Sequence, residues 1–270
     1  MNRPKRSGRY INQWVKERSE HPEQALELSV IIPAFNEAKR IPSTLLDITT
    51  FAKKHNLNLE IIVVDDGSSD ETVEVVNEFA RFAPEVRVIS LPENKGKGCA
   101  VKTGMQSASG SLVMFADADG STPFKEVIRL KTAIDNGADL AIGSRALFSE
   151  DTEVKTAWYR KYLGRMFNLC VNMLVLPGIA DTQCGFKLFK KDVARILFEH
   201  QTSDGFSFDV EILYLARKAG FKIAEIPVNW ENVPGSKVNL LLDAFKMFLD
   251  IVKFKFIHRN VSAPAGTGGK

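Results

Sequence analysis

The sequence predicts an α/β fold in which a mainly parallel, doubly wound sheet of Rossmann-like type is flanked by helices. Short runs of β-branched and aliphatic residues alternate with segments of helical length, a pattern typical of βαβ units. Acidic and polar residues follow several of these runs directly, as expected for loops that bind ligands beyond the carboxyl ends of parallel strands. The 270 residues, of which 44% are hydrophobic, suffice to bury one large core.

Seven runs are expected to form strands. Five regular ones span residues 28–33, 59–64, 86–90, 112–115 and 140–143, and two further ones span 185–189 and 222–227. A helix is expected to follow Ser69-Asp70-Glu71, because acidic residues complement the positive end of the helix dipole. Further helices are expected over 158–176 and 208–218.

The chain is expected to have four parts. Residues 1–27 form a polar tail or short helix, 28–237 the α/β domain, 238–258 an amphipathic helix, and 259–270 a flexible tail. In 238–257, polar residues recur every three or four positions and leave most of the circumference apolar. Such a helix lies in a membrane interface, with Phe248, Phe254 and Phe256 among its apolar residues, or it packs against the domain or a homodimer partner.

Composition argues against several classes of protein. The 36 basic and 33 acidic residues give a net charge of +3, so nothing favours a nucleic-acid partner. Cys99, Cys170 and Cys184 lack CxxC spacing, which argues against a disulfide framework or zinc site and favours a reducing cytoplasm. We find neither a signal peptide nor an uncharged apolar run of about 18 residues, and therefore expect no membrane span.

Asp117-Ala118-Asp119 is the leading candidate site. Its two carboxylates follow a hydrophobic run, where both can approach Mg²⁺ or Mn²⁺, cations that prefer oxygen ligands and also bind a diphosphate. A motif of this kind standing alone is more often an acidic turn that caps a helix, here expected near Pro123. The other polar strand ends favour the metal site, because they place further acidic residues at the same edge.

Two further loops can contact a nucleotide. The Asp66 carboxylate in Asp65-Asp66-Gly67-Ser68 can accept a hydrogen bond from a base N–H or a ribose hydroxyl, although this segment is also typical of a plain strand-to-helix turn. The glycine loop, residues 94–98 with sequence NKGKG, offers two lysines before a helix. It lacks the glycine order of a P-loop and by itself is typical of an ordinary basic loop.

Four motifs resemble the family 2 inverting glycosyltransferases of GT-A fold. They are SVIIPAFNE, IIVVDDGSSDET, NKGKGCAVKTGM and MFADADGSTP, in this order. The resemblance spans residues 28–255, and GSR (143–145), DTQCGFKLF (181–189), FSFDVE (206–211) and GSK (235–237) are most similar to dolichyl-phosphate glucosyltransferases. The likeness to dolichyl-phosphate mannose synthases is looser. The membrane-spanning segment of the eukaryotic glucosyltransferases is not found in this sequence, which favours a bacterial or archaeal relative with another polyprenyl carrier.

The resemblance implies a role for each matching residue. Nucleoside contacts are implied for Pro33, Phe35, Glu37 and Asp66, with Lys97 nearby. Nucleotide and metal contacts are implied for Asp117 and Asp119, and phosphate contacts for Arg145 and Lys237. A place between donor sugar and acceptor is implied for Asp181, Gln183 and Lys187. Arg160 and Arg165 are further phosphate candidates or plain helix-surface charges.

The implied reaction transfers a hexose, in the first place glucose from UDP-glucose, to a polyprenyl or dolichyl phosphate at the cytoplasmic face of a membrane. A phosphate acceptor is already anionic near neutral pH, since its second pKa is about 6, so Arg145, Lys187 and Lys237 can orient it without a general base. A hydroxyl acceptor needs a base, for which Asp181 is the candidate; otherwise Asp181 orders a loop.

Three alternative functions fit the same residues. The enzyme can transfer to a sugar hydroxyl in polysaccharide synthesis, or it can use GDP-mannose, because Asp66 suits uracil and guanine equally. A third alternative is a protein that binds nucleotide sugars without turnover and recruits partners to membranes.

Overall fold

The computed structural model describes residues 26–155, 171–172, 175–233, 250, 253–254 and 256–259. The expected helix over 158–176 and the expected helix over 238–258 therefore lie largely outside the described residues. Arg160, Arg165, Lys237 and Phe248 lie wholly outside them.

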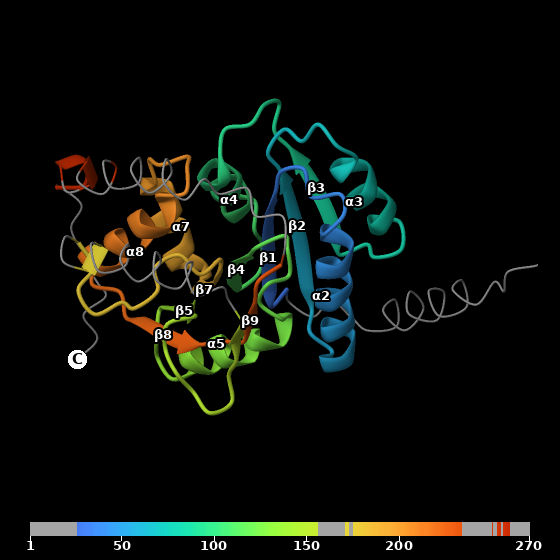
Figure 1. Cartoon of the computed structure of the whole chain (residues 1–270). Helices are drawn as coiled ribbons and strands as arrows, with labels where there is room; N and C mark the ends of the chain where they lie inside the picture. Colours follow the sequence, from blue (N-terminus) through green and yellow to red (C-terminus); the bar gives the residue numbers. More distant parts are fainter. Residues whose placement is uncertain are drawn as a thin grey trace, which may run out of the picture.

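A seven-stranded sheet forms the centre of the molecule, with strand order β3-β2-β1-β4-β7-β5-β8 (Figure 1). The strands are β1 (Leu28–Ala34), β2 (Leu59–Asp65), β3 (Val86–Ser90), β4 (Leu112–Ala116), β5 (Leu140–Ser144), β7 (Phe186–Lys190) and β8 (Ile223–Pro227). All neighbours pair in parallel except β7, which is antiparallel to both β4 and β5. The mainly parallel α/β sheet expected from the sequence is thus confirmed, and each predicted strand lies within one residue of its observed bounds.

Helices cover both faces of this sheet. They are α2 (Ile41–His55), α3 (Thr72–Ala80), α4 (Lys97–Gln106), the short 3-10 turn η1 (Phe124–Glu126), α5 (Val127–Asp135), α7 (Lys191–His200) and α8 (Phe208–Lys218). The apolar sides of α2, α3 and α5 share one core cluster, and those of α4, α7 and α8 share the other. Figure 1 shows α2 and α3 on one side of β1–β3 and α4 on the opposite side.

Strand β1 illustrates why the sequence folds this way. All seven of its residues are buried, with Val30 and Ile32 in one core cluster and Ile31 in the other. A strand covered on both faces has a nearly continuous apolar sequence, which is the pattern of parallel sheets between helices. Since β1 pairs in parallel with β2 and with β4, the carboxyl ends of all three strands lie at one edge of the sheet.

A second, two-stranded sheet was not expected from the sequence. It pairs β6 (Val154–Lys155) with β9 (Trp230–Glu231) in parallel. Two residues are too few to show a period of alternating side chains, so only the tertiary structure reveals this sheet.

The described residues near the C-terminus pack on α8. Phe254 is buried at 2% exposure in the same core cluster as α8. The expectation that Phe254 faces a membrane is therefore wrong, because the domain core covers its ring. Phe256 and Ile257, at 72% and 53% exposure, are the open apolar side chains there. In the described part of the chain, no helix combines the length and the hydropathy that a bilayer crossing requires.

Candidate active site

Asp117 and Asp119 lie directly beyond β4, as the sequence predicted. Oδ1 of Asp117 is 2.6 Å from Nζ of Lys97, in the first turn of α4. The Asp117 backbone N–H donates to the carbonyl of Gly185 at 3.0 Å, and the Ser121 N–H donates to Oδ1 of Asp119 at 3.0 Å. The loop after β4 is thus tied to α4 and to the chain entering β7.

The charges around these two aspartates are only partly balanced. Burial raises the pKa of Asp119, and the neighbouring Asp117 carboxylate raises it further. Burial lowers the pKa of Lys97, but Asp117 and Asp209 more than compensate and leave it raised, so the ammonium stays charged. Two adjacent carboxylates whose ionised forms repel each other favour a hard divalent cation.

These residues fit part of a metal site. The described residues contain no group of three or more histidine, cysteine or acidic side chains able to hold a metal ion. Oxygen atoms of a bound diphosphate and water would have to complete the coordination begun by Asp117 and Asp119.

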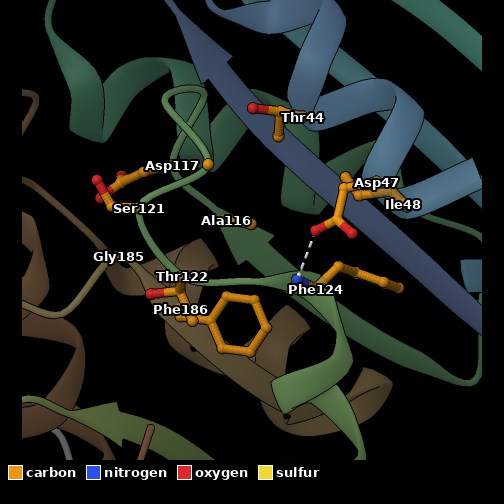
Figure 2. Close-up of a pocket in the computed structure, with 11 residues that line it drawn as sticks. Thr44, Asp47, Ile48, Ala116, Asp117, Ser121, Thr122, Phe124, Gly185 and Phe186 are labelled. Carbon is orange, nitrogen blue, oxygen red and sulfur yellow. Dashed lines mark hydrogen bonds between the residues drawn. The ribbon is translucent and has the colours of Figure 1, made fainter. Parts of the chain in front are cut away.

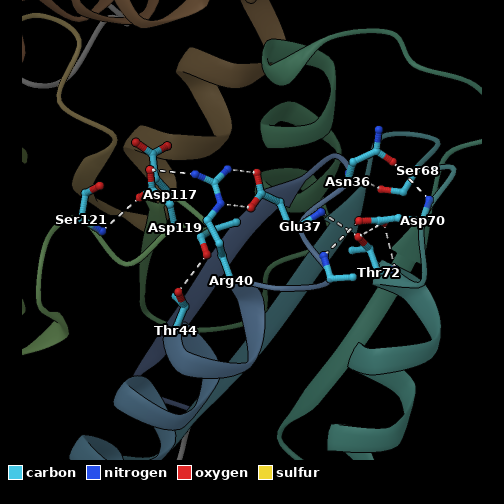
Figure 3. Close-up of polar contacts among 12 residues, drawn as sticks. Asn36, Glu37, Arg40, Thr44, Ser68, Asp70, Thr72, Asp117, Asp119 and Ser121 are labelled. Carbon is cyan, nitrogen blue, oxygen red and sulfur yellow. Dashed lines mark hydrogen bonds and ion pairs between the residues drawn. The ribbon is translucent and has the colours of Figure 1, made fainter. Parts of the chain in front are cut away.

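Arg40 is a site residue that sequence reasoning missed. Its guanidinium donates to both oxygens of the Glu37 carboxylate, with Nε 2.6 Å from Oε2, and NH1 lies 3.9 Å from Oδ2 of Asp119 (Figure 3). The hydrogen bonds to Glu37 raise the pKa of Arg40 despite its partial burial. The signal in the sequence was an arginine three residues after Glu37. The two side chains meet in a turn just before α2, where the N–H groups of Arg40 and Ile41 donate to the Glu37 carbonyl.

The glycine loop is joined to the end of β2 by hydrogen bonds from its backbone N–H groups. Asp66 accepts the N–H groups of Lys95 and Gly96, each at 2.8 Å, so its carboxylate anchors the glycine loop. Burial raises the pKa of Asp66, and these two hydrogen bonds oppose the rise. Pro33 is buried within β1, whereas Phe35 beyond it is partly exposed. The nucleoside contacts expected of these residues stay predictions.

Asn36 shapes the loop after β1. It has a positive φ of 54°, and its side-chain oxygen accepts the N–H groups of Ser69 and Asp70 at 2.7 and 3.2 Å. Its own N–H donates to Oγ of Ser68 at 2.7 Å (Figure 3). These bonds join the loops that follow β1 and β2 across the edge of the sheet.

Arg145, which directly follows β5, forms a forked ion pair with Asp181. The guanidinium donates to the two carboxylate oxygens at 2.7 and 2.9 Å, and the Arg145 N–H donates to Oδ2 at 3.0 Å. The guanidinium carbon lies 5.6 Å from the ring centre of Trp230. Burial would raise the pKa of Asp181, but the attraction of Arg145 and these hydrogen bonds hold it below its usual value.

This pairing bears on the two roles expected of Asp181, general base or loop-ordering residue. A carboxylate with a lowered pKa and three hydrogen bonds from one arginine is a weak proton acceptor. Asp181 also receives the Gln183 N–H at 3.2 Å, so it orders its own loop. The geometry favours the loop-ordering role over that of a general base.

Lys187 does not line the acceptor region. Its side chain is fully buried in β7, and Nζ donates to the Cys184 carbonyl at 2.8 Å and to the Asp209 carboxylate. The ammonium also lies 5.2 Å from the ring centre of Phe115. The expected contact with a phosphate is therefore wrong, because every side of this ammonium is covered by the protein's own groups.

A small cleft lies between α2 and the loop after β4 (Figure 2). Its lining includes Thr44, Asp47, Asp117, Ser121, Gly185 and Phe186. Gly185 has no room for a side chain, since an added Cβ would lie 2.1 Å from Oδ2 of Asp117. Burial raises the pKa of the adjacent Cys184 thiol to about 12, which excludes a thiolate nucleophile here near neutral pH.

Comparison with known families agrees with this arrangement. Residues 29–198 match the model of Glycosyl transferase family 2. The chain belongs to this family. Dolichyl-phosphate beta-glucosyltransferases from Dictyostelium discoideum and Homo sapiens are 38% and 37% identical to this glycosyltransferase over 250 and 225 residues. These alignments cover 88% and 78% of this chain, and 76% and 69% of the two relatives.

Solved structures confirm the expected GT-A fold. Glucosyl-3-phosphoglycerate synthase from Mycobacterium tuberculosis, in complex with Mn²⁺ and UDP-glucose, superposes with a TM-score of 0.61 at 18% identity, covering 100% of this chain and 88% of that one. Mannosyl-3-phosphoglycerate synthase from Rubrobacter xylanophilus gives a TM-score of 0.58 at 16% identity, with 96% and 81% covered.

The glycosyltransferase thus gathers most of the predicted site residues at one edge of its sheet. The loops that leave β1, β2 and β4 carry Glu37, Asp66 and the pair Asp117 and Asp119. Lys97 begins α4, and Arg145 follows β5. Of the other predicted residues, Lys187 is buried beneath this edge in its pair with Asp209, and Lys237 lies outside the described residues.

Gly185→Ala should disturb this site without breaking the core. The new methyl group would displace Asp117 from Lys97. Because Asp117 is expected to hold the sugar donor, this displacement should lower kcat/KM for sugar transfer about 100-fold. Gly220→Asn is the matched control, because Gly220 has a positive φ and open space around it. Equal kcat/KM values in Gly185→Ala and the wild-type enzyme would contradict the tight packing described here.

The Arg145–Asp181 pair should make stability depend on pH in the acid range. Because the folded-state pKa of Asp181 is lowered, its contribution is complete above the usual aspartate value of 3.8 and is lost as the pH falls through the folded-state value. Urea unfolding between about pH 5 and about pH 3 should therefore show a shallower loss of stability in Asp181→Asn than in the wild type. Asp135→Asn, at an exposed ion pair, should keep the wild-type slope. Identical slopes in all three proteins would refute this assignment.

Proposed function

We propose that this glycosyltransferase transfers glucose from UDP-glucose to dolichyl phosphate or a related polyprenyl phosphate, with inversion at the anomeric carbon. The observation that carries the proposal is the Asp117–Asp119 carboxylate pair, flanked by Lys97, Arg40 and Arg145 at the carboxyl edge of the sheet. The names of its relatives support a glucosyl donor and a dolichyl-phosphate acceptor.

The donor is proposed to bind between the loops after β1, β2 and β4. Phe35 and Glu37 would border the nucleoside with Asp66, and Asp117 and Asp119 would hold a divalent cation, Mg²⁺ or Mn²⁺, against the diphosphate. When bound, the cation would stabilise negative charge on the leaving UDP. Lys97 and Arg40, on opposite faces of the sheet, would neutralise the remaining charge.

The acceptor is proposed to be a phosphate monoester that needs no general base. Its anionic oxygen can attack the anomeric carbon directly once it is positioned. The Arg145 guanidinium is fixed by Asp181 and Trp230, and because the side chain is about one third exposed, it is suited to orient that phosphate. Lys237 would add a second charge, and Gln183 lies on the same loop as Asp181.

The enzyme is proposed to act as a peripheral protein on the cytoplasmic face of a membrane, where its active site can bind the phosphate of a lipid acceptor. Phe256 and Ile257 provide apolar side chains that the fold leaves exposed. Aromatic and aliphatic residues of this kind insert at the boundary between head groups and acyl chains. A homodimer interface is the alternative use of the same side chains.

Asp119→Ala should abolish lipid glycosylation. With labelled UDP-glucose, dolichyl phosphate and Mn²⁺, the wild type should form a product that partitions into organic solvent, whereas loss of a diphosphate-metal ligand should lower the rate by about 1,000-fold or more. A water-soluble product would favour a hydroxyl acceptor, and faster use of GDP-mannose would favour mannosyl transfer. Inactivity of wild type and variant with every donor and lipid would favour a binding protein without turnover.

Phe256→Asp with Ile257→Asp should weaken membrane association. Each change removes an apolar contact and adds a charge, so co-sedimentation with anionic liposomes should fall about tenfold or more. Phe82→Asp is the matched control, because Phe82 is 53% exposed near the end of α3, away from the C-terminal residues (Figure 1). Co-sedimentation equal to that of wild type in the double variant would contradict the membrane proposal.

A further inference from the structure

Glu211 is a buried carboxylate to which the reaction assigns no role. It lies on α8 with no exposed surface. Its oxygens accept the Thr202 hydroxyl at 2.6 Å, the Thr202 N–H at 3.0 Å and the Ser203 N–H at 2.8 Å. Nε2 of His258 lies 2.7 Å from Oε1. One carboxylate therefore joins the loop before α8 to a residue 47 positions later in the chain.

The clamp loop, defined as residues 201–204, packs directly on the glycine loop. An added Cβ at Gly96 would lie 2.4 Å from the Asp204 carbonyl oxygen, and one at Gly98 would lie 2.5 Å from that of Ser203. The Cys99 N–H donates to the Asp204 carbonyl at 3.2 Å. These backbones touch so closely that a shift of the clamp loop would move the glycine loop.

Two side-chain bonds strengthen this contact. Nε2 of Gln201 donates to the Gly98 carbonyl at 2.9 Å, and Nζ of Lys102 donates to the Gln201 carbonyl at 2.8 Å. The glycine loop is therefore held by Asp66 on the nucleoside side and by the clamp loop on the other. Lys97, which contacts Asp117, lies between these two attachments.

The described C-terminal residues reach the clamp loop by two routes. His258 contacts Glu211 directly, while Oδ2 of Asp250 accepts the Ser207 hydroxyl at 2.7 Å, and Ser207 lies 2.7 Å from the Ser203 hydroxyl. His258 is 3% exposed and packs near the rings of Tyr214 and Phe254. A displacement of Asp250 or His258 would thus change the hydrogen bonds that hold Thr202 and Ser203.

We infer that Glu211 is a positioning residue, which links His258 near the C-terminus to the glycine loop and thereby sets the affinity for the nucleotide donor. The inference rests on the proposed function, because it takes the glycine loop to border UDP-glucose. Contact of Phe256 and Ile257 with a membrane would act through the neighbouring His258 and Glu211 on the position of the glycine loop. Donor binding and the position of the membrane-facing segment are then coupled through one buried carboxylate.

Binding of UDP in the presence of MnCl₂, measured by calorimetry on the full chain, tests this inference. Glu211→Gln places an amide N–H₂ against backbone donors, so the Kd for UDP should rise about tenfold. The KM for UDP-glucose should rise in parallel, with kcat within about twofold of wild type, because no reacting atom is touched. Thr202→Val removes one hydroxyl only and should raise Kd about threefold.

His258→Phe tests whether the C-terminal residues affect UDP binding while the bonds from Thr202 and Ser203 to Glu211 stay in place. Phenylalanine preserves packing against Tyr214 and Phe254 but loses the bond to Glu211, so Kd for UDP should rise about threefold or more although residue 258 is remote from the donor. Glu60→Gln is the control, because Glu60 also accepts a backbone N–H and a hydroxyl, at the opposite edge of the sheet. Its Kd should equal that of wild type.

The possible outcomes separate the two proposals. If wild type binds UDP and the Thr202 and His258 variants bind it equally well, the positioning role is refuted while the proposed function stands. The positioning role also fails if Glu60→Gln weakens binding as much as Glu211→Gln, since the effect would then be general destabilisation. If wild type itself binds no UDP, both proposals fail. Should Glu211→Gln not fold, the other two variants decide.

Discussion

The ion pair between Lys97 and Asp117 joins the first turn of α4 to the end of β4, and the proposed donor site is arranged around it. Asp117 and Asp119 repel each other, and burial makes the ionised form of Asp119 still less favourable. Lys97 offsets this repulsion from one face of the sheet, while Arg40 approaches from α2 on the other. The beginnings of α2 and α4 thus place two cations at an acidic edge that remains suited to a metal-bound diphosphate.

Two further ion pairs, Lys187–Asp209 and Arg145–Asp181, stabilise the structure around the site. Lys187 and Asp209 satisfy each other inside the core, where loss of either partner would leave an uncompensated charge. Arg145 and Asp181 form a second pair, but the Arg145 side chain stays about one third exposed. The difference in exposure separates a structural cation from one that can meet a ligand, although both are basic residues near the same strand ends.

The antiparallel strand β7 gives the site its second half. It runs between two strands that are parallel to each other, so its N-terminal end lies at the same edge as the C-terminal ends of β4 and β5. Gly185 therefore meets Asp117, and the loop that carries Asp181 meets Arg145. A base held in an ion pair is of little use for a hydroxyl, which agrees with an acceptor that is already anionic.

The sequence by itself determined the seven strands, their polar ends and the motif Asp117-Ala118-Asp119, because apolar runs and acidic loops are local features. It did not reveal that Arg40 approaches Asp119, that Asp66 anchors the glycine loop, or that β6 and β9 form a second sheet. Lys187 and Phe254 resemble exposed functional residues in sequence, yet both are buried. Tertiary structure alone decided these points, since burial and ion pairing depend on segments far apart in the chain, as Glu211 and His258 illustrate.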